Sequence, residues 1–61
     1  MRKTLRIVIL SEMKQTVSED LRRLEEFYFV TSDVSERKIL RDKINYSKSL
    51  LNEIDQMIEE L

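Results

Sequence analysis

The 61-residue chain contains neither glycine nor proline, and this limits its connections more than any other feature. Glycine reaches positive φ at no steric cost and proline fixes many turns, so a chain without both has few devices for tight turns. Such a chain favours long regular elements joined by very short connections. Its apolar residues recur at helical spacing, with one interruption near residues 31–33. We therefore predict an all-α protein.

The first helix is predicted over about residues 3–30. Its apolar side chains are spaced three or four residues apart, which keeps them on one helix face. Leu5 and Ile9 extend this line towards the N-terminus in steps of four. The line itself consists of Met13, Val17, Leu21, Leu24 and Tyr28.

After a turn at residues 31–32, the second helix is predicted over residues 33–60. Asp33 is placed to cap it, and Glu36 follows at the spacing of a capping box. Its apolar residues form two adjacent lines, a stripe wide enough to contact more than one helix. The first line is Leu40, Ile44, Leu51, Ile54, Ile58 and Leu61, and the second is Ile39, Tyr46, Leu50 and Met57.

Oppositely charged residues four positions apart support both helices by a few tenths of a kcal/mol each. Charge is also unequal between the two ends of the chain. Residues 1–10 hold three basic side chains and no acid, whereas residues 49–61 hold four acids and no base. In an antiparallel hairpin these two ends lie side by side. The four ion pairs expected between residues four positions apart within a helix are Glu19–Arg23, Arg22–Glu26, Asp33–Arg37 and Lys38–Asp42.

Helices of nearly equal length predict a single domain over residues 1–61, a two-helix antiparallel hairpin. So short a chain buries little surface, and without Cys or His it lacks a disulfide or zinc staple. We therefore expect a homodimer, a four-helix bundle with coiled-coil-like packing. The residues expected in the core and dimer interface are Met13, Val17, Leu21, Leu24, Tyr28, Leu40, Ile44, Leu50, Leu51, Ile54, Met57 and Ile58.

The N-terminal segment also fits a strand over residues 3–10, because the run Ile7–Ile9 is β-branched. With that strand, the order of elements over about residues 2–45 is strand, helix, loop and helix. This order resembles that of the ribbon–helix–helix DNA-binding repressors. That resemblance implies a dimeric transcriptional regulator whose paired strands contact bases through Arg2, Thr4 and Arg6. Both helices are longer than those of that family. A basic cluster over residues 37–48 is a second nucleic-acid candidate, which we interpret instead as a solvated, ion-paired face.

The segment Glu53–Ile58 resembles the C-terminal helix signature of the small sporulation aspartyl-phosphate phosphatases, which are also short helical hairpins. That signature begins with Ser-Gln, where this chain has Leu51 and Asn52. The resemblance implies a phosphatase-like hairpin as a further alternative and assigns no site residue. The segment Arg41–Ile44 is similar to the hairpin module of nucleotide-excision repair proteins over four residues.

The composition argues against an enzyme. No His is present for acid–base work near neutrality, no Cys can act as a nucleophile and no glycine-rich loop can cradle a phosphate. We expect no cofactor and no metal.

The longest apolar run, Ile7–Leu10, falls far short of a membrane span, and no signal-peptide cleavage site follows it. We therefore expect a cytoplasmic protein.

Three consecutive aromatic residues, Phe27–Phe29, cannot all lie on one helix face. We expect this cluster to cover the turn by packing on Val30, Val34 and Ile39. The alternative is an exposed anchor for another protein. The function that these observations favour is a non-enzymatic interaction module, an assembly or adaptor protein that acts through helical surfaces as a homodimer.

Overall fold

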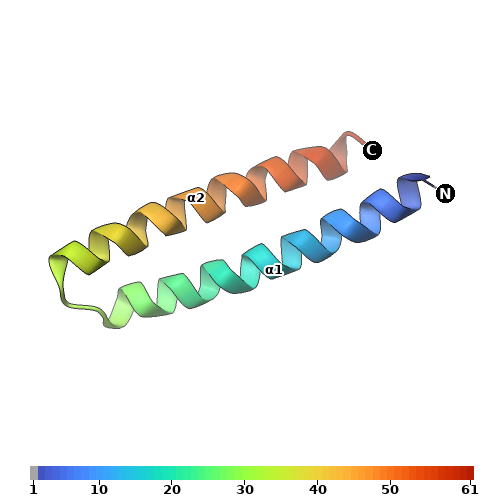
Figure 1. The fold of residues 1–61 in the computed structure, drawn as a ribbon. Coiled ribbons are helices and arrows are strands. Elements are labelled where there is room, and N and C mark those ends of the chain that lie inside the picture. The colour runs from blue at the N-terminus through green and yellow to red at the C-terminus, as the bar shows by residue number, and fades with distance from the viewer. Residues whose placement is uncertain (1) are drawn as a thin grey trace.

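The computed structural model describes residues 2–61, and side chains from residue 3 onward. It consists of two helices, α1 (Arg2–Val30) and α2 (Val34–Glu59). They pack side by side and antiparallel, so that both chain ends lie at one end of a rod and the turn lies at the other (Figure 1). The rod measures 49 × 15 × 11 Å. The prediction of an all-α helical hairpin is confirmed.

No strand occurs between residues 2 and 61, so the alternative with a strand over residues 3–10 is wrong. That segment continues α1 without a break. The physical reason is that Leu10 lies seven residues before Val17, and this spacing places it on the same face as the rest of the contact with α2. Packing along a continuous helix therefore outweighs the β preference of the run Ile7–Ile9.

The connection between the helices spans only residues 31–33 and uses no positive φ in the part of the chain described. Asp33 is extended (φ −71°, ψ 125°), and its carboxylate accepts hydrogen bonds from the backbone N–H groups of Ser35 and Glu36. At the other side of the turn, the Arg37 guanidinium donates to the Thr31 carbonyl over 3.1 Å. These contacts satisfy helix-terminal groups that would otherwise lack partners.

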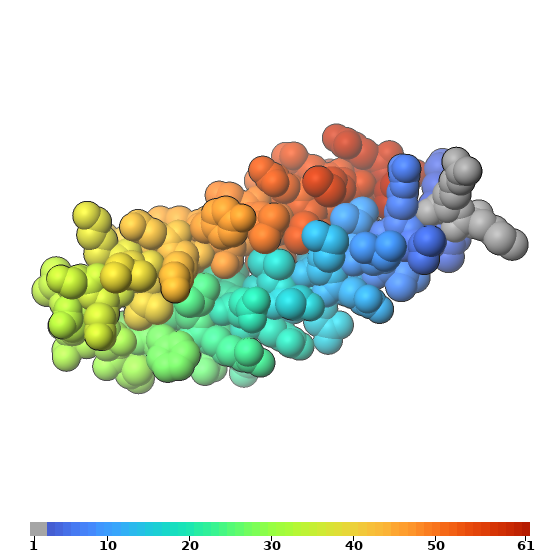
Figure 2. Space-filling model, viewed as in Figure 1, coloured from blue at the N-terminus to red at the C-terminus, as the bar shows by residue number. Residues whose placement is uncertain are grey.

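Side chains in alternating steps of three and four form the contact between the helices, here called the seam. On α2 it begins at Arg37, includes the buried Ile44 and Ile54, and reaches Leu61 beyond the helix end. On α1 it consists of Leu10, Val17, Leu21, Leu24 and Tyr28, all half-buried. Only Ile44 and Ile54 are buried among the described residues, because two helices packed into a thin rod cannot enclose a core (Figure 2).

The line Leu5–Ile9–Met13 does not join the seam, contrary to expectation. Met13 remains 45% exposed, and Leu10 takes the seam position instead. Four residues turn an α-helix by slightly more than one revolution, so each step of four rotates the line by about 40°. Three such steps before Val17 carry Leu5, Ile9 and Met13 around the side of α1.

Candidate interaction surface

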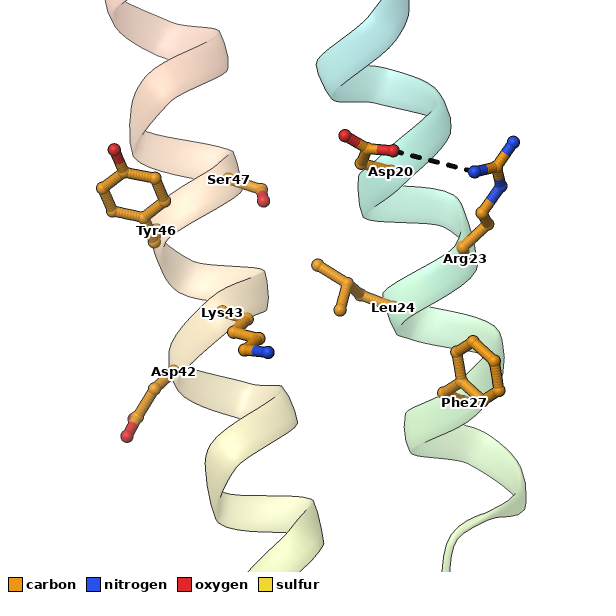
Figure 3. Close-up of a pocket in the computed structure, with 8 residues that line it drawn as sticks. All are labelled: Asp20, Arg23, Leu24, Phe27, Asp42, Lys43, Tyr46 and Ser47. Carbon is orange, nitrogen blue, oxygen red and sulfur yellow. Dashed lines mark ion pairs between the residues drawn. The ribbon is translucent and has the colours of Figure 1, made fainter.

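One long side of the hairpin, here called the apolar side, carries a groove between the two helices. Its central part has a volume of about 570 Å³. It is lined by Leu24, Phe27, Tyr46 and Ser47 and by four charged residues, Asp20 and Arg23 from α1 and Asp42 and Lys43 from α2. Leu24 and Ser47 point into the space between the helices (Figure 3). Ser47 occupies a seam position with a small side chain, which leaves room for the groove here.

The apolar side continues towards both ends of the rod. At the open end, Ile9 and Met57 lie along a second groove, and at the turn end Phe27 and Ile39 lie along a third. Met13 and Leu50 fall on the same lines by helical periodicity. The apolar side is thus defined by Ile9, Met13, Phe27, Ile39, Tyr46, Leu50 and Met57, most of them about half exposed or more.

The opposite long side, here called the polar side, carries charged contacts between the helices. Lys14 Nζ lies 2.6 Å from Asp55 Oδ1, and both side chains are about half exposed. Lys14 falls on the seam spacing between Leu10 and Val17. A lysine at this position turns its ammonium group to the edge of the seam, where the carboxylate of α2 meets it.

Nearer the turn, Tyr28 is held by two arginines of α2. The Arg37 guanidinium lies 4.3 Å from the ring centroid, and Arg41 Nη2 donates to the phenolic oxygen over 3.2 Å. These two guanidinium groups, Arg37 first, lower the pKa of Tyr28 to about 8. The same contact raises the pKa of Arg41. Tyr28 therefore joins seam packing to the charge of the polar side.

Among the expected i,i+4 ion pairs, Arg22–Glu26 is formed, at 3.6 Å. Arg23 contacts Asp20 in place of Glu19, and Arg37 contacts Tyr28 and Thr31 in place of Asp33. The physical reason for the second change is that the Asp33 carboxylate already accepts two backbone hydrogen bonds at the start of α2.

The residues expected in the core and dimer interface divide between the seam and the apolar side. Most are buried or half-buried between α1 and α2, whereas Met13 and Met57 line the exposed apolar side. Sequence reasoning missed Leu10, whose seven-residue spacing to Val17 would have revealed it. The half-buried or buried members are Val17, Leu21, Leu24, Tyr28, Leu40, Ile44, Leu50, Leu51, Ile54 and Ile58.

The expected base-contacting residues do not form the proposed alternation. Thr4 and Arg6 are exposed on α1, and residues two positions apart share a face in a strand but not in a helix. The side chain of Arg2 lies outside the described residues. Within the basic cluster at residues 37–48, Arg37 and Arg41 are engaged with Tyr28. The oppositely charged chain ends do lie side by side, and Arg6 and Glu60 line the same groove.

The aromatic cluster does not cover the turn as expected. Phe29 is 88% exposed, and Val30 and Val34 are also largely exposed. Phe27 alone faces Ile39, across the groove at the turn end. Position 29 lies on the polar side of α1, where it borders Arg41 and Lys48 rather than apolar residues of the turn.

The described part of the chain was predicted to hold no metal site and no membrane span, and the structure gives a finding on each. No group of three or more acidic, His or Cys side chains there could hold a metal ion. Neither helix is long and apolar enough to cross a membrane. Comparisons of the chain with known protein families, with curated proteins and with solved structures find no match.

Proposed function

We propose that this protein is a non-enzymatic interaction module that works as a homodimer and presents helical surfaces to assemble with other protein chains. The observation that carries the proposal is the apolar surface that the hairpin leaves uncovered along one side. Monomeric soluble proteins rarely expose large contiguous apolar patches, and larger ones mark binding sites. Exposed apolar residues lie on this side at both ends of the rod, Ile9 and Met57 at the open end and Phe27 and Ile39 at the turn, with Asp20 and Lys43 between them.

The seam buries only two hydrophobic side chains among the described residues, so alone it gives the hairpin little stability. Fully burying a Leu, Ile, Met or Phe side chain contributes roughly 1.5–3 kcal/mol. Ile9, Phe27, Ile39 and Met57 each remain about half exposed or more in the single hairpin. Burying even part of this surface against another helical pair supplies a driving force of the size that small domains otherwise obtain from disulfides or metals.

An enzymatic role draws no support from the site. The grooves lie open along a thin rod, whereas small-molecule sites are typically concave and enclose most of their ligand. The pKa of Tyr28 is lowered, and both partners of its phenol are arginines. This cluster joins the two helices, and the two guanidinium groups that contact Tyr28 are neither nucleophiles nor general bases.

A pair of neighbouring substitutions tests the proposal. Met57→Glu places a charge on the apolar side, whereas Gln56→Glu places the same charge on the adjacent, exposed position of α2. We expect the wild type and Gln56→Glu to have twice the mass of the chain in light scattering after size-exclusion chromatography. Met57→Glu should have the mass of one chain or lose its helical signal. A wild type that stays monomeric and folded at all concentrations would contradict the proposal.

A further inference from the structure

We infer that a second copy of this chain covers the apolar side, with the two-fold axis parallel to the helices and both turns at the same end. The inference rests on the proposed function and specifies the surface and the orientation. In this arrangement α1 of one subunit packs against α2 of the other, and the four helices form a square bundle.

The position of the apolar side around each helix fits a four-helix bundle. On α1, Ile9 and Phe27 are about five turns apart and lie about a quarter turn from the centre of the seam. On α2, Ile39 and Met57 have the same spacing and a similar offset towards the same side. A helix in a square bundle has two neighbours about a quarter turn apart. Each helix of the hairpin thus presents one apolar line to each of two neighbours.

The available area also fits a dimer. The broad side of the rod is 49 Å long and 15 Å wide, a projected footprint of roughly 700 Å² per subunit, which is of the same order as the ~800 Å² of accessible surface that each partner buries in a standard interface. An occupant must match this length to cover both Ile9 and Phe27. A second hairpin has the required length and an identical apolar side.

The register of apolar and charged residues selects the orientation. Ile9 lies level with Met57 in the hairpin, and Phe27 lies level with Ile39. A two-fold axis along the rod preserves these levels, so Ile9 meets the partner's Met57 and Phe27 meets the partner's Ile39. Apolar residues then face apolar residues at both ends of the interface.

Charged residues on the apolar side agree with the same register. Arg6 and Glu60 lie level at the open end, and Asp20 and Lys43 line the central groove at one level. With the turns at one end, Arg6 approaches the partner's Glu60 and Asp20 approaches the partner's Lys43. Opposite charges across an interface fix register more than they add affinity.

The reversed orientation, with the turns at opposite ends, misaligns these groups. It inverts the levels about the middle of the rod, which lies near Val17 on α1 and Leu50 on α2. Met13 would then lie near the partner's Asp20, and Met57 near the partner's Lys43. Met57 would then face a charge in place of the partner's Ile9, at a desolvation cost that the first orientation avoids, whereas Leu50 would face its own copy in the partner.

Spin labels at the turn distinguish the two orientations. Ser32 is exposed in the connection, and Ser32→Cys introduces the chain's single thiol. Packed helices lie 8–10 Å apart, so we expect label-to-label distances within about 25 Å in double electron–electron resonance. Distances near the 49 Å length of the rod would overturn the inferred orientation. Sedimentation of the same labelled sample separates this outcome from a monomer, in which the proposed function itself would fail.

Cysteine cross-linking provides an independent readout of the register. We expect a mixture of Ile9→Cys and Met57→Cys chains to form a disulfide-linked heterodimer on mild oxidation, since their Cα atoms would come within bonding range. The matched mixture of Lys43→Cys and Met57→Cys chains should link only in the reversed orientation. Cross-linking of the second mixture and not of the first would overturn the inference and leave a homodimer in place.

Discussion

The two long sides of the hairpin connect the same helices but differ in what they leave exposed. On the polar side, charged groups such as Lys14 and Asp55 already have partners within the chain. On the apolar side, large side chains such as Phe27 and Met57 face a groove with no covering element in the single chain. The hairpin therefore pairs charges across its polar side but cannot bury the apolar side chains on the opposite side.

The largest loss of stability is expected from a charged substitution in the seam, because the seam holds the two helices, and hence both sides, together. Ile54 is only 1% exposed, and Ile54→Asp would bury a carboxylate without a partner. We expect a loss of more than about 3 kcal/mol, enough to unfold the helices, as measured by circular dichroism. The same change at the exposed Gln56 should leave the helical signal intact. A helical, cooperatively melting Ile54→Asp chain would show that the seam is placed wrongly.

The same substitution at two phenylalanines, one on each side, compares how much each side contributes to dimerisation. Phe27 is 60% exposed on the apolar side, and Phe29, two residues later, is 88% exposed on the polar side. We expect Phe27→Glu to weaken dimerisation by about 2 kcal/mol or more, roughly a 30-fold rise in the dissociation constant. Phe29→Glu should leave that constant unchanged. Sedimentation equilibrium measures both, and equal effects would remove the distinction between the two sides.

A smaller effect is expected from the ion pair of the polar side. Asp55→Asn removes the partner of Lys14 at a half-exposed position, which should cost about 0.2–1 kcal/mol. Urea unfolding at low and high salt measures this cost, which should shrink as salt screens the wild-type pair. A loss of several kcal/mol that does not depend on salt would mean that the polar side holds the hairpin together through something other than this contact.

The smallest effect concerns the pH dependence of Tyr28. Its pKa of about 8 in the folded chain lies below the ordinary value of 10, because Arg37 and Arg41 stabilise the phenolate. The stabilisation is therefore fully present above pH 10 and is lost as the pH falls through 8. We expect a near-ultraviolet titration step near pH 8 that Tyr28→Phe removes and Tyr46→Phe retains. A wild type without this step would show that the arginines do not hold the phenol.

Helix positions and the start of α2 follow directly from the sequence. Helical spacing without any Gly or Pro indicates two long helices, and Asp33 with Glu36 indicates where the second begins. Both features are local, so a single chain reveals them. The expected boundaries, about 3–30 and 33–60, lie close to those of α1 (Arg2–Val30) and α2 (Val34–Glu59).

Features that depend on the angle between helix faces were harder to predict. A step of four residues looks as regular as a mixed step of three and four, but only the mixed pattern keeps facing the partner helix. This is why Met13 was placed in the seam and Leu10 outside it. The Lys14–Asp55 and Tyr28–Arg41 contacts join residues far apart in the chain, and no local spacing indicates them.

The central claim is that the apolar side is buried against a second copy when the protein is folded. The most direct test is the melting temperature of the wild type by circular dichroism over a hundredfold range of chain concentration. Because association stabilises only the folded state, the account predicts a melting temperature that rises steadily with concentration. A cooperative melting transition at one temperature throughout that range, in a sample that sediments as a single chain, would contradict the account.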